Sequence, residues 1–81
     1  MTNLLKDLNM LVLYLSGWEE ESERHPGEMI FRAWRGYLFE VLKELEKEGL
    51  IYQHKGLKHI VLTSKGIERA KNIRSRIRIA R

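Results

Sequence analysis

Apolar residues recur at helical spacing over residues 3–16 and predict the first helix. The stripe that we expect to be buried consists of Leu4, Leu5, Leu8, Leu11, Val12 and Leu15. Met10, Leu13 and Tyr14 are apolar but lie off this stripe, so the helix is apolar on more than one face. Either the core wraps around the helix, or the extra face meets another subunit. Gly17 follows the last periodic residue, where a left-handed helix end is usual.

The periodic pattern breaks over residues 17–30. This stretch contains Pro26, Gly27 and five glutamates against the single cation Arg24, a balance of −4. Acidic, glycine- and proline-containing segments are typical of exposed loops. We therefore expect a solvated acidic loop, with Trp18 as its one bulky anchor.

The next ordered segment spans residues 30–48. A short aromatic run over residues 30–34 precedes a predicted helix over residues 37–48, which Gly49 ends. The apolar stripe expected for this segment consists of Trp34, Leu38, Val41, Leu42 and Leu45. Trp34 and Tyr37 could stack on the bases of a single strand, but as members of an apolar stripe they are expected in the core.

A β-hairpin is predicted over residues 50–63, with arms at residues 50–54 and 59–63. Gly56 gives the turn between the arms its permissive backbone. A last helix starts at Thr63 or Ser64, either of which can cap it through its hydroxyl. The apolar face expected for this helix consists of Ile67, Ala70, Ile73 and Ile77.

The order helix, irregular segment, helix, hairpin, helix predicts one α+β, mainly α domain over residues 1–81. A helix followed by a two-stranded ribbon is the arrangement of a winged helix, in which the hairpin is the wing and a C-terminal helix follows. Basic and small or apolar residues alternate over residues 74–81. This end is a helix terminus, a frayed arm that contacts DNA, or part of a dimer seam.

Several short motifs resemble a small, uncharacterised winged-helix family found in bacterial genomes. They are Leu13-Tyr14-Leu15, Ala33-Trp34-Arg35-Gly36-Tyr37, Leu45-Glu46-Lys47-Glu48-Gly49-Leu50-Ile51, and Ile60-Val61-Leu62-Thr63-Ser64-Lys65-Gly66 with Ala70 following. The resemblance covers about residues 8–75 and supports the winged-helix fold. The loop before Ala33 is longer and more acidic than the family pattern. The family carries no established activity, so a nucleic-acid role is an analogy from the fold.

Positive charge collects in the C-terminal third of the chain. The net charge is +4, residues 64–81 alone have a balance of +6, and the hairpin turn adds Lys55 and Lys58. This asymmetry indicates a polyanionic partner, although a basic tail can also be merely solvated. The predicted central helix has a balance of −2, which disfavours major-groove reading because carboxylates repel phosphates.

We therefore expect a winged-helix DNA-binding protein with a transcription-regulator-like role. Winged-helix regulators commonly dimerise, so the resemblance also implies a homodimer. The residues expected to contact DNA are Arg32, Arg35, Lys43, Lys47, Lys55, Lys58, Arg69, Arg74, Arg76 and Arg78. A homodimer is expected through Met10, Leu13, Tyr14, Ile73 and Ile77. The rival hypothesis is a protein–protein adaptor on the same scaffold, motivated by the acidic central helix and the surplus apolar surface of the first. RNA binding through the basic C-terminal helix is a third hypothesis.

No pattern in the chain indicates an enzyme or a cofactor. Cysteine is absent, and no serine lies in a nucleophile motif or glycine-rich phosphate loop. His54 and His59 flank the hairpin turn, but no third metal ligand is evident, because His25 lies in a separate loop. The start has no secretory leader, and the apolar run at residues 11–15 is too short to span a bilayer. We expect a cytoplasmic protein with no membrane partner, metal or small-molecule substrate.

Overall fold

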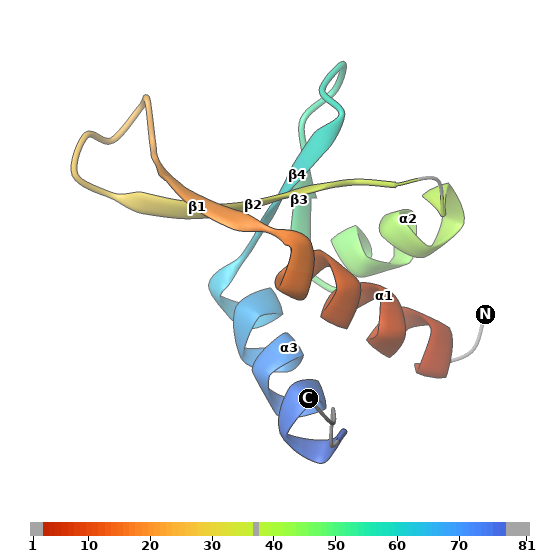
Figure 1. Ribbon diagram of the computed structural model, residues 1–81. Coiled ribbons are helices and arrows are strands. Elements are labelled where there is room, and N and C mark those ends of the chain that lie inside the picture. Colours follow the sequence, from red (N-terminus) through yellow and green to blue (C-terminus); the bar gives the residue numbers. More distant parts are fainter. Residues whose placement is uncertain (1–2, 37, 78–81) are drawn as a thin grey trace.

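Three helices cover one face of a four-stranded antiparallel sheet in the computed structural model, which describes residues 3–36 and 38–77 (Figure 1). The helices are α1 (Asn3–Ser16), α2 (Phe39–Lys47) and α3 (Ser64–Arg76). The strands are β1 (Trp18–Glu21), β2 (Met29–Trp34), β3 (Ile51–Gln53) and β4 (His59–Leu62), and their order in the sheet is β1-β2-β4-β3. The fold is α+β and mainly α, as the sequence predicts.

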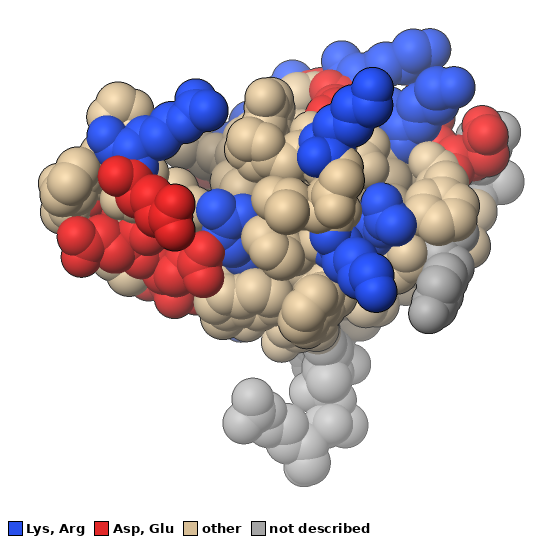
Figure 2. Space-filling view, turned by 90° about the horizontal axis from the view of Figure 1, so that it is seen from above, with Lys and Arg blue, Asp and Glu red and all other residues tan. Residues whose placement is uncertain are grey.

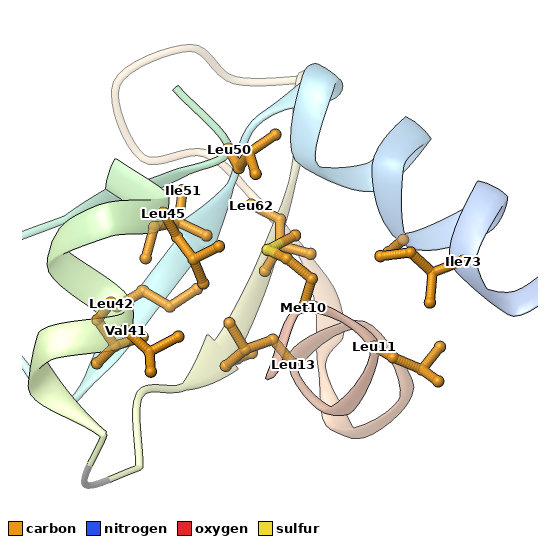
Figure 3. Close-up of a cluster of buried hydrophobic side chains, with 13 residues drawn as sticks. Met10, Leu11, Leu13, Val41, Leu42, Leu45, Leu50, Ile51, Leu62 and Ile73 are labelled. Carbon is orange, nitrogen blue, oxygen red and sulfur yellow. The ribbon is translucent and has the colours of Figure 1, made fainter. Parts of the chain in front are cut away.

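The core lies between the sheet and the helices. Met10 of α1 sits at its centre, with α2 on one side and α3 on the other (Figure 3). The fully buried side chains come from every helix and from three strands, which explains how a short chain assembles one continuous core. They are Met10, Leu11, Leu13, Ala33, Val41, Leu42, Leu45, Leu50, Ile51, Ile60, Leu62, Ala70 and Ile73.

The prediction of an acidic loop over residues 17–30 is only partly correct, because residues 18–21 and 29–30 form strands and only residues 22–28 form the exposed loop between them. Trp18 pairs with Arg32 and Glu21 with Met29, so β1 and β2 form a hairpin whose turn contains Pro26. Glutamates are poor strand formers in isolation. Here β1 is an edge strand with alternate side chains exposed, and β2 gains its second partner from β4. Tertiary pairing outweighs the local propensity.

The buried face of α1 shares only Leu11 with the predicted stripe. Leu4 is 66% exposed and Val12 62% exposed, whereas Met10 and Leu13, off the predicted stripe, are buried. The helix has two apolar faces, and its docking decides between them. A Cβ at Gly17 would overlap the ring of Phe31, so the end of α1 lies against β2 at this glycine. Gly17 therefore permits close packing and does not adopt the predicted left-handed conformation.

The β3–β4 hairpin and the start of α3 agree with the prediction. Thr63 caps α3 by accepting a hydrogen bond from the backbone N–H of Gly66 (3.0 Å). The Thr63 hydroxyl also donates a hydrogen bond to the carbonyl oxygen of Gly49 (2.6 Å). The backbone N–H of Thr63 donates to the carbonyl oxygen of Leu50 (3.1 Å). A Cβ at Gly66 would overlap the carbonyl oxygen of Leu50. These residues join the end of the hairpin to its beginning.

The outer face of the sheet, away from the helices, carries an unexpected set of rings. Pairing of Trp18 with Arg32, and of Trp34 with His59, places these four side chains on that face. Trp34 is 60% exposed, so its predicted place in the core is wrong. It is the last residue of β2 and not part of α2, so helical spacing does not apply to it. Tyr37 lies outside the described residues.

Candidate nucleic-acid interface

The turn of the β3–β4 hairpin projects from the molecule on the side opposite α3 (Figure 1). It is closed by a hydrogen bond from the backbone N–H of Leu57 to the carbonyl oxygen of His54 (3.1 Å), and Gly56 has a φ of 88°. Lys55 and Lys58 are both exposed. Within the part of the chain that the structure describes, neither lysine has an ion-pair partner. Both ammonium groups are therefore available to an external anion.

Arg35 is held beside this turn by the hairpin itself. Its backbone N–H donates to the carbonyl oxygen of Lys58 (3.0 Å), and its guanidinium donates to that of Leu57 (3.4 Å). The guanidinium carbon also lies 5.3 Å from the centre of the Phe39 ring. We call Arg35, Lys55 and Lys58 the basic tip. The three cations come from two distant segments that the sheet brings together.

Arg32 is not available in the same way. Its guanidinium donates to a carboxylate oxygen of Glu20 and, from the other side, to Nδ1 of His59 (3.0 Å). The side chain is only 17% exposed. An arginine held in this manner contributes to the cohesion of β1, β2 and β4, and a phosphate would have to displace both partners to bind it.

The exposed side of α2 carries both signs of charge. Lys43 and Lys47 are exposed, but the helix also contains Glu40, Glu44 and Glu46. Lys47 lies 4.0 Å from Glu44, so part of its charge is compensated within the helix. Seen from above, acidic side chains gather at the β1–β2 end of the molecule, and lysine and arginine predominate toward the centre and right (Figure 2). The sheet side is thus polarised and not uniformly basic.

The basic residues of α3 lie away from the tip (Figure 1). Arg69 pairs with Asp7 of α1 (3.7 Å), and Arg74 lies over the ring of Tyr14 (5.9 Å). Arg76 is exposed near the end of the helix, and Arg78 lies outside the described residues. Sequence proximity in the C-terminal third therefore does not translate into one continuous surface with the hairpin turn.

The residues predicted for a dimer interface are mostly in the core. Met10, Leu13 and Ile73 are each at most 3% exposed, so they cannot meet a second subunit without unfolding the domain. Tyr14 packs against Phe31, with ring centres 5.5 Å apart, and Ile77 is 37% exposed. The error arises because α1 packs with Met10 and Leu13 toward the core, although the predicted stripe excludes both residues.

A different surface of α1 is apolar and exposed. Leu5, Leu8, Val12 and Leu15, which we call the α1 seam, are between 39% and 62% exposed. The first three line a groove of about 310 Å³ together with Leu38, which precedes α2. The two ionisable residues of α1 form ion pairs, Lys6 with Glu48 (2.8 Å), the residue after α2, and Asp7 with Arg69 of α3 (3.7 Å). The four seam side chains are therefore uncharged, and among the described residues the charged side chain that lines the adjoining groove is that of Arg35.

Two glutamates join elements of the fold. The indole N–H of Trp18 donates to Glu20 (3.1 Å), and this bond, together with Arg32, holds the pKa of the Glu20 carboxyl below its ordinary value of 4.5. The Lys6 ammonium donates to Glu48 (2.8 Å) and lowers the pKa of that carboxyl below the same value. Both shifts are opposed by partial desolvation.

Acid should therefore weaken the fold in a defined window. A carboxyl whose pKa is lower in the folded state binds fewer protons there than in the unfolded chain, so its stabilisation is full above pH 4.5 and is lost as the pH falls through the folded-state value. We expect urea midpoints that are flat from pH 7 to 5 and fall below 4.5. Glu48→Gln should lower the midpoint at pH 7 and flatten the acid limb. An unchanged acid limb would contradict this assignment.

Histidines form no metal site among the described residues. That part of the chain contains no group of three His, Cys, Asp or Glu side chains that could hold a metal ion, and two of the imidazole rings have other contacts. His59 accepts from Arg32 (3.0 Å), and the His54 ring lies 5.0 Å from the ring of Tyr52. Likewise, no helix within residues 3–36 and 38–77 is long and apolar enough to cross a bilayer.

Comparison with known proteins places the chain in one family. It belongs to the family described as a domain of unknown function (DUF6429), whose model matches residues 1–80. No curated protein matches the chain significantly. No solved structure does so either. The family match agrees with the resemblance to a small uncharacterised family and adds no activity to it.

Proposed function

We propose that this member of the DUF6429 family is a cytoplasmic, transcription-regulator-like winged-helix protein that binds DNA through the basic tip. The observation that carries the proposal is the tip itself. Lys55 and Lys58 are exposed without a carboxylate partner in the described chain, and Arg35 is fixed beside them by hydrogen bonds to the turn. Mobile and fixed cations on a protruding turn are suited to the phosphates of a nucleic-acid backbone.

The arrangement of the strands supports a winged helix. In the order β2-β4-β3, the hairpin that follows α2 is joined to a strand that precedes α2, and the hairpin turn extends past the sheet as a wing does. A helix-turn-helix needs two helices joined by a short turn. Among the described residues between β2 and β3, α2 is the only helix. Binding is therefore attributed to the wing and not to a helix pair.

Base reading in the major groove is not part of the proposal. The exposed carboxylates of α2 would face phosphates if this helix entered a groove, and like charges repel. Phosphate contacts without base contacts give binding that depends on salt and little on sequence. The function supported here is thus contact with the DNA backbone.

We further infer that the protein is a homodimer formed through the α1 seam. The seam residues are spaced three, four and three positions apart, which is the spacing of a helix–helix seam. A second copy presents the same four apolar side chains, so the two copies can bury them against one another, with Arg35 at the adjoining groove as the charged side chain that the contact must accommodate. Leu5, Leu8 and Val12 line the groove themselves, and in a two-fold contact each copy would present this same patch to the other.

The rival function is an adaptor that binds a different protein. The observation in its favour is the same exposed apolar seam, since contiguous apolar surface marks interaction sites of several kinds. The two hypotheses differ in the occupant. A dimer consumes the seam, whereas an adaptor leaves the isolated protein monomeric.

Charge reversal at the tip tests the proposal. We expect Lys55→Glu to weaken binding to a 20-base-pair random duplex by at least tenfold at low salt, because it replaces an attraction to phosphate with a repulsion. The measurement is fluorescence anisotropy with labelled duplex.

The matched control is Lys71→Glu, which makes the same change in net charge on exposed α3, away from the tip. It should change the affinity less than threefold. Equal losses in the two variants would mean that net charge, and not the tip, governs binding. No binding by the native chain would refute the DNA proposal and favour the adaptor.

A further inference from the structure

Trp34 is an exposed ring at the edge of an aromatic cluster. It is 60% exposed, its ring centre is 5.6 Å from that of Trp18 and 6.0 Å from that of His59, and both neighbours lie on the outer face of the sheet. Leaving so large an apolar ring in water costs free energy that burial would recover. An exposed tryptophan whose ring contacts other rings at tilted and edge-on angles is well suited to stacking on a flat ligand.

A hollow beside Trp34 combines this ring with two cations. Its volume is about 360 Å³, and it is lined by Trp34, Arg35, Gly36 and Lys58. The size is at the lower end of small-molecule sites, which run from about 300 to 1,000 Å³. Arg35 and Lys58 both belong to the basic tip. The hollow therefore places an aromatic ring next to two cations. A nucleotide likewise has a flat base next to an anionic phosphate.

The chemistry of the hollow favours an unpaired nucleotide. In a duplex the faces of the bases are covered by their neighbours, so an exposed ring on the protein cannot stack on them. An unpaired base offers its face, and stacking on an aromatic side chain favours binding with little dependence on sequence. The apolar groove shares Trp34, Arg35 and Gly36 with the hollow but is not lined by Lys58, so the hollow is the better place for a phosphate.

We propose that this hollow holds one unpaired nucleotide of a single strand, with its base on Trp34 and its phosphate on Arg35 and Lys58. The inference rests on the proposed nucleic-acid function and names its preferred substrate. The basic tip binds backbone phosphates of either form, and the Trp34 hollow adds affinity only for the single-stranded form.

The test compares a 12-nucleotide thymidine strand with a 12-base-pair duplex by fluorescence anisotropy. The native chain should bind the single strand about tenfold more tightly at the same salt concentration. Trp34→Leu should remove that preference and leave duplex binding within twofold of native. The matched control is Tyr52→Leu, which removes another exposed ring of the sheet that does not line the hollow. It should leave both affinities unchanged, and circular dichroism should show that both variants are folded.

The possible outcomes separate the two proposals. Equal native affinity for both forms, or equal losses for both in Trp34→Leu, would overturn the single-strand inference while leaving the basic tip intact. No binding of either form would overturn both. A second experiment adds thymidine monophosphate as a competitor of the labelled single strand. It should compete with the strand only at millimolar concentration, because a lone nucleotide lacks the neighbouring phosphates. Competition at micromolar concentration would instead identify a free nucleotide as the ligand and would overturn the proposal that the hollow binds a nucleotide within a single strand.

Discussion

Gly66→Ala should destabilise the fold by about 3 kcal/mol, at the upper end of the usual cost of overpacking. For a domain of this size that lowers the melting temperature by roughly 12–24 °C. The added methyl group would overlap the carbonyl oxygen of Leu50, which belongs to the backbone and cannot rotate away. Relief requires the first turn of α3 to move, and that movement would break the hydrogen bond from Gly66 to Thr63.

The opposing effect is smaller. Alanine is a better helix former than glycine by about 1 kcal/mol, so propensity alone predicts stabilisation. Glu68→Ala is the control, because it makes an alanine substitution in the next part of α3 at an exposed position. Thermal unfolding followed by circular dichroism should show a large loss for Gly66→Ala and a change of at most a few degrees for the control. Equal or higher stability of Gly66→Ala would contradict the close approach of α3 to Leu50.

Val12→Glu should convert the proposed homodimer to a monomer. Val12 lies in the middle of the α1 seam and is 62% exposed, so the substitution is compatible with the folded subunit. In a two-fold dimer it would bring carboxylates from both copies into an apolar contact, where burial of an unpaired charge is costly. Light scattering should therefore report a mass of one chain, 9.7 kDa, in place of two.

Met29→Glu is the matched control for this prediction. Met29 is 56% exposed at the start of β2. Its substitution makes the same apolar-to-acidic change as Val12→Glu, but away from the seam. This variant should remain dimeric. A native protein that is monomeric at micromolar concentration would refute the homodimer and leave the seam to a different partner. Dimers in both variants would place the interface elsewhere.

The elements whose periodicity and end signals agree are the ones that the sequence predicts well. The helix bounds at residues 3–16 match α1, and the hairpin arms, Gly56 turn and Thr63 cap are as expected. In these segments local propensity and tertiary environment favour the same structure. The β1–β2 hairpin escaped prediction because its strand character comes from pairing of β2 with β4, a contact between residues about thirty positions apart.

The candidate site is only partly predictable for the same reason. Lys55 and Lys58 follow from the turn, because exposed cations on a hairpin need only local information. The contacts of Arg32 with Glu20 and His59 depend on the register of three strands, which local sequence does not show. The α1 face fails for a different reason: both sides are apolar, and periodicity cannot show which one packs. The exposure of Trp34 follows from its being in β2, which the helical pattern concealed.

The salt dependence of duplex binding tests the central claim most directly. If the three cations of the basic tip each neutralise one phosphate, the logarithm of the association constant should fall with the logarithm of salt concentration with a slope of about −2.7. Replacing Lys55 and Lys58 by glutamine should reduce the slope to about −0.9. A slope near zero for the native chain, or a slope that both substitutions leave unchanged, would contradict phosphate binding by the tip.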